Sequence, residues 1–430
     1  MTTIPDQQIF LHLLQNEFKL ATGCTDPAAI ASTVARAAEQ LPSRQLDDVA
    51  SIEIELSPNI LKNGYNVDIP GTSARGIPLA VALGYVMGDS SVGFEIFQGL
   101  KEEHVVLAEQ LVAAKKITIK QKAEGTELSI YCILTSTKGD HVEVLVKQDY
   151  FNTQHIKLNG QTIYNNEGNP KSKVADKGYS LKDLKAFIEQ TPIEDLAFVA
   201  DGIRTNIAFL EEGLQNPRGL KIGKILTSAY EGQIDSKAIS DISMRIKMLT
   251  SAAVDSRMGG SPLAVMSSGG SGNLGLGGTI PIVVVCEHYQ FTDEQRIRAV
   301  ALANLVHIYM KQMIGRLTAV CGGVLVGMGT AAAIVWLHGG TIQQMEGAIN
   351  NIAANITGMI CDGANYGCSF KVSTAQVEAY FAAVLALQNC MATSTEGIVG
   401  ADNKQTLSNI ANIFKEMSKM DPVVLQMIPN

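Results

Sequence analysis

The sequence predicts an α+β protein with a mainly helical body and a small inserted α+β domain built on an antiparallel sheet. Apolar residues recur at helical spacing near the N-terminus, and they do so again over most of the chain after Leu181. Between these regions, from Lys116 onward, apolar and polar residues alternate with a period of two, which is typical of half-buried strands. We therefore expect a helical body of residues 1–95 and 176–430, interrupted by an α+β insert of residues 96–175.

The N-terminal region predicts two amphipathic helices followed by a strand. Apolar side chains four positions apart over residues 9–14 form one helical face. Asp26 is a good N-cap and Pro27 suits the first helical turn, so we expect a second helix to begin there and to run through residues 28–41. Residues 51–56, SIEIEL, alternate in the manner of a half-buried strand.

The insert predicts a meandering antiparallel sheet, which follows an expected helix over residues 79–87. Turn signals at Gly125, at Lys138-Gly139 and at Asn159-Gly160 separate the alternating runs. The four strand-like runs are KITIKQK, ELSIYCILTST, HVEVLVKQ and HIKLNGQTIY.

Composition and charge exclude several classes of protein. The 430 residues are 46% hydrophobic and 18% charged and include 39 glycines, which indicates a tightly packed folded chain. A net charge of -8 argues against a nucleic-acid partner, because binding to phosphates requires a basic surface. The start of the chain, MTTIPDQQIF, lacks the basic and apolar regions of a secretory signal, so we expect a cytoplasmic protein.

One apolar segment raises the question of a membrane span. Residues 317–345 contain no Asp, Glu, Lys or Arg and are long enough to cross a bilayer. Glycine and alanine dominate the segment, however, and its flanks lack an aromatic belt. We therefore expect a buried core helix and no membrane association.

Three of the seven cysteines lie in contexts that let their thiols converge. Cys361 and Cys368 flank a loop, CDGANYGC, ahead of a helix start that the capping pair Ser373 and Gln376 predicts. Two glycines follow Cys321 and allow another backbone or a cofactor to approach closely. Structural zinc normally has four ligands, whereas three thiolates with a vacant position suit an iron–sulfur cluster. Spacing alone leaves open the alternative that these cysteines are small buried hydrophobic residues.

Cys24 has a different context, because in ATGCTDP it stands two residues before the expected N-cap Asp26. The electropositive end of a helix lowers the pKa of a thiol and favours a thiolate base or nucleophile, while a nearby carboxylate acts in the opposite direction. The structural alternative is a cysteine packed in a turn.

A glycine-rich loop, SSGGSGNLGLGG, contains Gly270-x-Gly272-x-x-Gly275, the form of a dinucleotide-binding fingerprint. Such a fingerprint follows a strand and opens a helix within a βαβ unit, a context that we do not predict here. We expect instead a nest of polar groups suited to a small carboxylate or to the edge of a cluster, and a flexible turn remains the alternative. The candidate binding residues are Ser267, Ser268, Ser271 and Asn273.

Taken together, these motifs give the chain a close resemblance to the L-cysteine desulfidase family, which is related to the alpha chain of iron–sulfur L-serine dehydratases. The matching motifs are ATGCTDP, SSGGSGN, TAVCGG and ICDGANYGC, and the cysteine intervals of 40 and seven residues fit the family pattern. The resemblance extends over nearly the whole chain.

The resemblance implies that Cys321, Cys361 and Cys368 ligate a [4Fe-4S] cluster and that Cys24 is the catalytic proton acceptor. It also implies a lyase that eliminates hydrogen sulfide from L-cysteine and leaves pyruvate and ammonia. The assignment of the serine and asparagine groups of residues 267–273 to the substrate carboxylate is our own inference and not a property of the family.

Two alternatives remain open. An L-serine dehydratase would use the same cluster on a hydroxyl in place of a thiolate. A purely structural or membrane-associated helical protein would need no cluster. For the enzyme we expect a small amino acid as the partner, with neither nucleic acid nor membrane, and the oligomeric state stays open, with a homodimer as one option.

Overall fold

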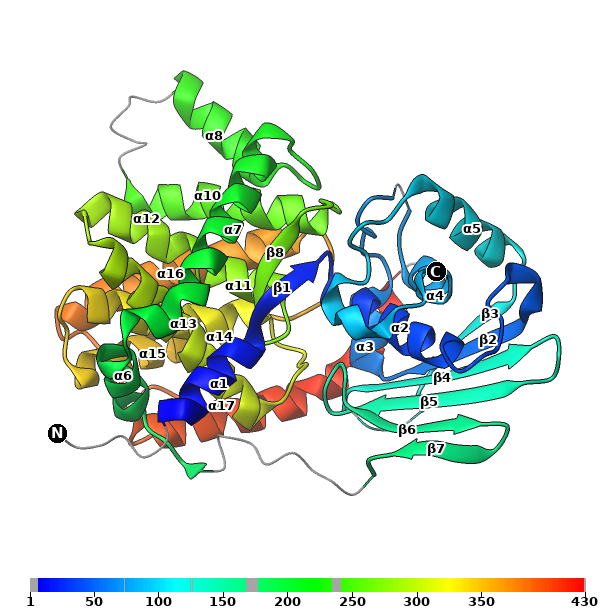
Figure 1. Cartoon of the computed structure of the whole chain (residues 1–430). Coiled ribbons are helices and arrows are strands. Elements are labelled where there is room, and N and C mark those ends of the chain that lie inside the picture. Colours follow the sequence, from blue (N-terminus) through cyan, green and yellow to red (C-terminus); the bar gives the residue numbers. More distant parts are fainter. Residues whose placement is uncertain are drawn as a thin grey trace.

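The computed structural model of the chain confirms the α+β class and contains two hydrophobic cores (Figure 1). It describes residues 7–72, 74–123, 125, 127–167, 177–233 and 241–428. A helical layer forms one side of the molecule, and a six-stranded sheet with its own helices forms the other (Figure 1).

The helical body packs around α14 (Gly322–Leu337), which lies in contact with α13, α15 and α16. Nearly every residue of α14 is buried, and a helix that is apolar on all sides belongs in the centre of a core. The expected buried core helix is thus confirmed, and in the described part of the chain no helix is long and apolar enough to cross a membrane. The other helices of this body are α1 (Gln7–Glu17), α6 (Leu181–Gln190), α7 (Ala197–Gln215), α8 (Ile222–Gln233), α10 (Ile242–Met258), α11 (Gly272–Gly277), α12 (Ile280–Tyr289), α13 (Asp293–Ile314), α15 (Ile342–Ile356), α16 (Cys368–Leu387) and α17 (Asn403–Met417).

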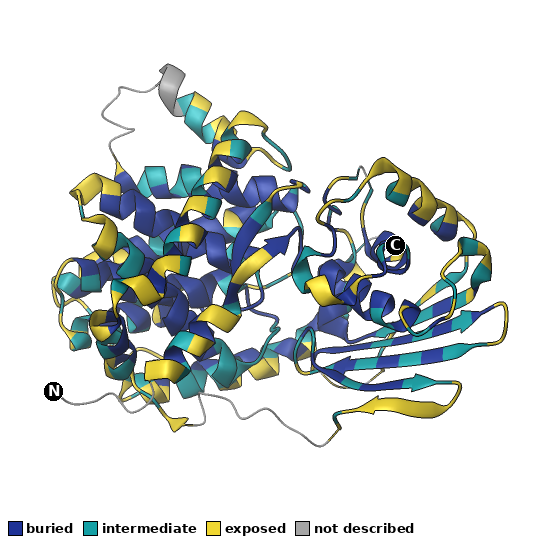
Figure 2. Ribbon diagram, in the orientation of Figure 1, coloured by how far each residue is buried: buried dark blue, intermediate teal, exposed yellow. Residues whose placement is uncertain are grey.

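The second core lies between a six-stranded sheet and the helices α2 and α4. The strands follow the order β3-β2-β4-β5-β6-β7, and buried residues alternate with more exposed ones along β4 and β5, whereas β7 is exposed throughout (Figure 2). The elements of this part are α2 (Thr25–Ala38), β2 (Val49–Leu56), α3 (Pro58–Gly64), α4 (Ile77–Met87), α5 (Glu102–Ala113), β3 (Ile117–Gln121), β4 (Ser129–Ser136), β5 (His141–Lys147), β6 (Thr153–Leu158) and β7 (Gln161–Asn165), and the C-terminal helix α18 (Asp421–Met427) contacts α3.

The predicted meander is correct for β4 to β7 and wrong for the first run. The run at residues 116–122 forms β3, which pairs with β2 in parallel and not with β4. Three α-helices and a 3-10 helix lie between β2 and β3, and they supply the crossover that a parallel pair requires. The last run divides into β6 and β7 at Asn159-Gly160, where both residues have positive φ angles, as a tight hairpin demands.

The second core is larger than the insert predicted from the sequence. The insert of residues 96–175 holds β3 to β7, but α2, β2 and α4, which complete the same core, all precede residue 96. The domain boundaries at residues 95 and 176 therefore remain a prediction.

A two-stranded antiparallel ribbon, which the sequence did not predict, lies between the two parts of the molecule (Figure 1). It consists of β1 (Phe18–Thr22) and β8 (Ala264–Ser268), paired so that Phe18 faces Ser268 and Thr22 faces Ala264. The side chain of Asn206 bonds to both the amide and the carbonyl of Met266, which holds the outer edge of β8.

The glycine-rich loop follows this ribbon and differs from the expected context. The strand β8 does lead into it, and the short helix α11 does begin within it at Gly272, so that part of the prediction was wrong. The strand partner β1 is antiparallel, however, and the ribbon has only two strands, so the loop does not belong to a parallel βαβ unit.

Candidate active site

Cys24 is the N-cap residue of α2, two positions earlier than the expected cap Asp26. Its side chain is buried, and its Sγ lies 3.9 Å from Asp26 Oδ2. Burial, together with the negative charge of Asp26, raises the pKa of Cys24 to about 12, although the positive charge of Arg257 acts in the opposite direction. The lowered pKa that the helix end suggested is therefore not found, since desolvation of the thiolate outweighs the helix dipole.

Asp26 belongs to a buried polar network beside this thiol. Its Oδ1 accepts hydrogen bonds from Asn63 Nδ2 at 3.5 Å and from the Tyr150 hydroxyl at 3.4 Å. Burial raises the pKa of Asp26 to about 6, while these bonds and the charges of Arg257 and Lys311 limit the rise. At neutral pH the group next to Cys24 is a carboxylate.

Cys321 and Cys361 are held side by side by backbone pairing. The segments that carry them form an antiparallel bridge between Val320 and Ile360. The amide of each cysteine donates to a carbonyl of the opposite segment, at 2.8 Å for Cys321 and 2.7 Å for Cys361. Two thiols that are 40 residues apart in the sequence thereby become neighbours.

Cys368 is the first residue of α16, which begins five positions before the helix start predicted from Ser373 and Gln376. Its Sγ lies 3.7 Å from the carbonyl oxygen of Gly363. Burial raises the pKa of Cys368 to about 11, and it raises that of Cys321 as well, with a further contribution from the charges of the other two thiols. All three thiols therefore lie within electrostatic reach of one another.

The side-chain chemistry of these three cysteines fits an iron–sulfur cluster. In the part of the chain that the structure describes, no three or more Cys, His, Asp or Glu side chains stand in positions to hold one ion. Three soft thiols with no carboxylate or imidazole among them are the ligands that iron–sulfur clusters select. Lys371 and Arg257 place positive charge near the thiols, which favours their thiolate forms.

The polar residues of the loop from 267 to 273 do not form one cluster. Ser267 Oγ donates to the carbonyl of Lys19 at 2.7 Å, and Ser268 Oγ lies 3.0 Å from His307 Nε2. The antiparallel register places both serines at the end of β8 that is remote from Cys24. Binding of a substrate by Ser267 and Ser268 stays a prediction.

The other two loop candidates lie closer to α11. Ser271 is the N-cap residue of α11, and its amide and carbonyl both pair with Ser268. Asn273 Nδ2 lies 3.3 Å from Met258 Sδ, and its Oδ1 is buried without a hydrogen-bond partner. Of the four loop candidates, Asn273 is the one with a buried polar atom that lacks a hydrogen-bond partner.

Arg257, which the sequence analysis missed, lies in the same region. It is 4% exposed, at the C-terminal end of α10, and its positive charge lowers the pKa values of Cys24, Asp26 and Cys368. A basic residue in the last turn of a helix is common because it complements the helix dipole, so nothing in the sequence marked this arginine as special.

Comparison with known proteins places the chain in a family. The profile of the serine dehydratase alpha chain family matches residues 93–426. The chain belongs to the serine dehydratase alpha chain family. It is 35% identical over 431 residues to a UPF0597 protein of Bacteroides fragilis, a match that covers 100% of this chain and 99% of the relative. A UPF0597 protein of Clostridium botulinum is 35% identical over 421 residues, which cover 96% of this chain and 95% of that protein.

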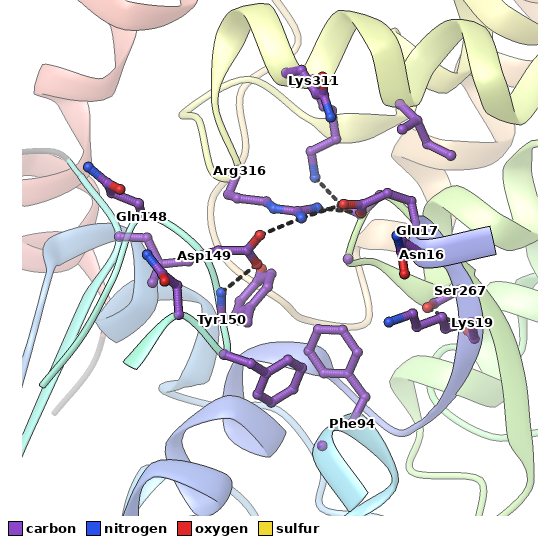
Figure 3. A pocket seen from close by; sticks show the side chains of 18 of the residues that line it. Asn16, Glu17, Lys19, Phe94, Gln148, Asp149, Tyr150, Ser267, Lys311 and Arg316 are labelled. Carbon is purple, nitrogen blue, oxygen red and sulfur yellow. Dashed lines mark hydrogen bonds and ion pairs between the residues drawn. The ribbon is translucent and has the colours of Figure 1, made fainter. Parts of the chain in front are cut away.

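This member of the serine dehydratase alpha chain family also has a large open cavity between its two parts. The cavity has a volume of about 1540 Å³, and Glu17, Asp149, Lys311 and Arg316 are among its lining residues (Figure 3). Arg316 bonds to both carboxylates of this set, Glu17 on the helical side and Asp149 on the sheet side (Figure 3). The cavity wall also includes Tyr150, whose hydroxyl reaches Asp26.

Proposed function

We propose that this member of the serine dehydratase alpha chain family is an L-cysteine desulfidase, an iron–sulfur lyase that releases hydrogen sulfide from L-cysteine and yields pyruvate and ammonia. The observation that supports it best is the grouping of four thiols. Cys24 lies within electrostatic reach of Cys368, and Cys321 and Cys361 are adjacent on paired segments.

In this proposal Cys321, Cys361 and Cys368 hold a [4Fe-4S] cluster. When bound, such a cluster supplies a Lewis-acidic iron with a vacant position, which withdraws electrons from the leaving sulfur. The three cysteines come from two segments of the chain, and Cys321 is buried while Cys361 and Cys368 are partly exposed. Their role in the chain is to fix the position of the leaving group relative to Cys24.

Cys24 acts on the other end of the substrate as the acceptor of the α-proton. The Cα–H electron pair forms the Cα=Cβ double bond as the Cβ–S bond breaks, and the aminoacrylate that leaves hydrolyses to pyruvate and ammonia. A thiol with a pKa of about 12 must first lose its own proton, and in this proposal the carboxylate of Asp26, with Oδ2 3.9 Å from the thiol sulfur, receives it. The charge of Arg257 favours the resulting thiolate.

The reducing cytoplasm that we propose as the location suits this chemistry. All seven cysteines are free thiols, as cluster ligation and general-base catalysis both require.

The proposal is tested on anaerobically purified protein reconstituted with iron and sulfide. We expect a brown protein with broad absorption at about 400 nm, which releases sulfide from L-cysteine faster than ammonia from L-serine. The Cys24→Ala variant should keep the absorption and lose turnover, whereas Cys361→Ala should lose both. A colourless, iron-free wild type after reconstitution, or normal turnover by Cys24→Ala, would contradict the proposal.

L-Serine dehydration is the second candidate, and the description of the matching family favours it. The same four cysteines would serve, with a hydroxyl in place of the thiolate as the leaving group. A ratio of the two kcat/KM values that favours L-serine would decide for this alternative.

A further inference from the structure

The guanidinium of Arg257 is buried and forms no ion pair with any described residue. The side chain is 4% exposed, and none of the ion pairs formed within the described ranges includes it. Its single hydrogen-bond contact is from a terminal nitrogen to Met258 Sδ at 3.5 Å, and its Nε has no partner. A group with five N–H donors thus uses one of them, on a weak acceptor.

Such an arrangement is costly for the folded protein unless an anion completes it. A guanidinium remains charged at any physiological pH, so it does not escape the cost of burial by losing a proton. Buried charges in proteins are normally paired, and an uncompensated one is strongly unfavourable. Arg298 in α13 shows the normal case, because it bonds to Glu294 and to the carbonyl oxygens of Ile188 and Thr191.

The backbone near Arg257 is adapted to the side chain. A Cβ atom added at Gly272 would overlap Arg257 Nε, so only glycine lets the guanidinium lie against the start of α11. On the other side its charge acts on Cys24, Asp26 and Cys368. The guanidinium therefore lies against the glycine-rich loop and within electrostatic reach of the proposed catalytic thiol.

A second unsatisfied group lies on the same neighbour. Asn273 Nδ2 contacts Met258 Sδ at 3.3 Å, the sulfur that Arg257 also contacts. Asn273 Oδ1 is buried and has no hydrogen-bond donor. The guanidinium of Arg257 and Asn273 Oδ1 thus lie near the same methionine sulfur, one as an unpaired cation and the other as an unpaired acceptor. Together they complement the carboxylate and the ammonium of an α-amino acid.

We propose that Arg257 binds the α-carboxylate of the amino-acid substrate and that Asn273 Oδ1 accepts a hydrogen bond from its ammonium group. This inference rests on the proposed function, which it deepens by naming the recognition of the backbone part of the substrate. It moves the carboxylate site from the serine hydroxyls of the loop, which are engaged with Lys19 and His307, to an arginine on α10.

The test uses Arg257→Gln in the reconstituted protein, with L-alanine as the probe. L-Alanine has the carboxylate and the ammonium of the substrate but no leaving group, so its binding is measured by calorimetry without turnover. We expect the dissociation constant of the variant to rise at least tenfold, roughly the effect of losing a charge-assisted pair of hydrogen bonds. Ethylamine, which lacks the carboxylate, should bind both proteins equally weakly.

Thermal unfolding separates binding from a structural role. Because Arg257 forms no ion pair, Arg257→Gln should unfold at the same temperature as the wild type or higher, and L-alanine should no longer raise the midpoint. The matched control Arg298→Gln removes a paired arginine, so it should lower the midpoint and leave the L-alanine dissociation constant unchanged.

Gly272→Ala provides a second variant that keeps the charge and displaces the guanidinium. It too should weaken L-alanine binding while the absorption of the cluster is unchanged. Unaltered L-alanine binding in Arg257→Gln, or a wild type that binds ethylamine as tightly as L-alanine, would overturn the inference. Failure of the proposed function would give a different result. A wild type that binds L-alanine but releases no sulfide would refute the lyase activity and leave the amino-acid site intact.

Discussion

The Nζ atom of Lys62 lies 2.9 Å from the carbonyl oxygen of Cys361, although the two residues are 299 positions apart. The same ammonium pairs with Asp421 Oδ1 at 2.5 Å, and neither side chain is more than 2% exposed. One buried lysine therefore ties the C-terminal helix α18 to the loop that carries a proposed cluster ligand.

Asp421→Asn should destabilise the protein by about 3 kcal/mol, because it leaves the ammonium of Lys62 buried and unpaired. Urea unfolding of the metal-free protein measures this. The double variant Lys62→Met with Asp421→Leu should regain most of the loss, since replacing both partners with apolar groups leaves no buried charge. As a control, Glu53→Gln breaks the exposed pair with Lys120 and should cost less than about 1 kcal/mol. Equal losses from Asp421→Asn and Glu53→Gln would contradict this account.

The stability of the metal-free protein should fall as the pH rises from about 4 to about 6 through the titration of Asp26. Burial raises the pKa of this group from 3.8 to about 6, so the folded state holds the proton more tightly than the unfolded chain does. The contribution of protonated Asp26 to stability is fully present below the pKa of the unfolded state. It is lost as the pH rises through the pKa of the folded state, a change of about 3 kcal/mol. The Asp26→Asn variant should lack this pH-dependent component. The difference in unfolding free energy between the wild type and the variant should therefore shrink or change sign between about pH 4 and about pH 6. A pH-independent difference would show that Asp26 does not titrate in this range.

Gly275→Ala should destabilise the fold by about 2 kcal/mol or more, because an added Cβ would overlap the carbonyl oxygen of Met266 and force α11 away from β8. Gly358→Ala is the matched control. An added Cβ there meets no heavy atom within 4 Å and φ is not positive, so the unfolding free energy should be unchanged or slightly higher. Chemical denaturation of the two variants side by side tests the close contact.

Arg316→Lys should not act as a conservative substitution. The guanidinium bonds to both oxygens of Glu17 and to Asp149, a geometry that a single ammonium does not reproduce. We expect a loss of about 1–3 kcal/mol in unfolding free energy, nearly as large as that of Arg316→Met. If Arg316→Lys retained the full stability, the bonds of the guanidinium to both Glu17 and Asp149 would not be needed to join the helical and sheet parts.

The local elements were predictable where one period dominates a segment. The strands β4 to β7 followed from alternation, and α14 followed from a segment without charges, because each pattern depends on residues that are close in sequence. Partnerships between distant segments were not predictable. The parallel pair of β2 and β3 and the ribbon of β1 and β8 depend on which exposed edges meet after the chain has folded back.

The candidate site divides in the same way. The cysteines could be selected from the sequence because thiols are rare and their spacing is characteristic, and the structure places Cys321 beside Cys361. The pKa of Cys24 was misjudged, since the helix end is a local feature whereas burial is a property of the whole fold. Arg257 was missed for the same reason, because a buried Nε without a hydrogen-bond partner is visible only when every neighbour is known.

The ribbon of β1 and β8 has a consequence for how this site tolerates change. Cys24 follows the end of β1 by two residues, and Asn273 follows the end of β8 by five. The positions of both residues therefore depend on the register in which β1 and β8 pair. A shift of one residue would turn every side chain of a strand to the opposite face, and the two bonds from Asn206 to Met266 resist such a shift. The number of residues between the ribbon and these two side chains is therefore a stricter requirement than the identity of the surrounding apolar residues. Insertion or deletion of a single residue would misalign the Cys24 thiol and the glycine-rich loop, whereas many substitutions among core residues would leave them aligned.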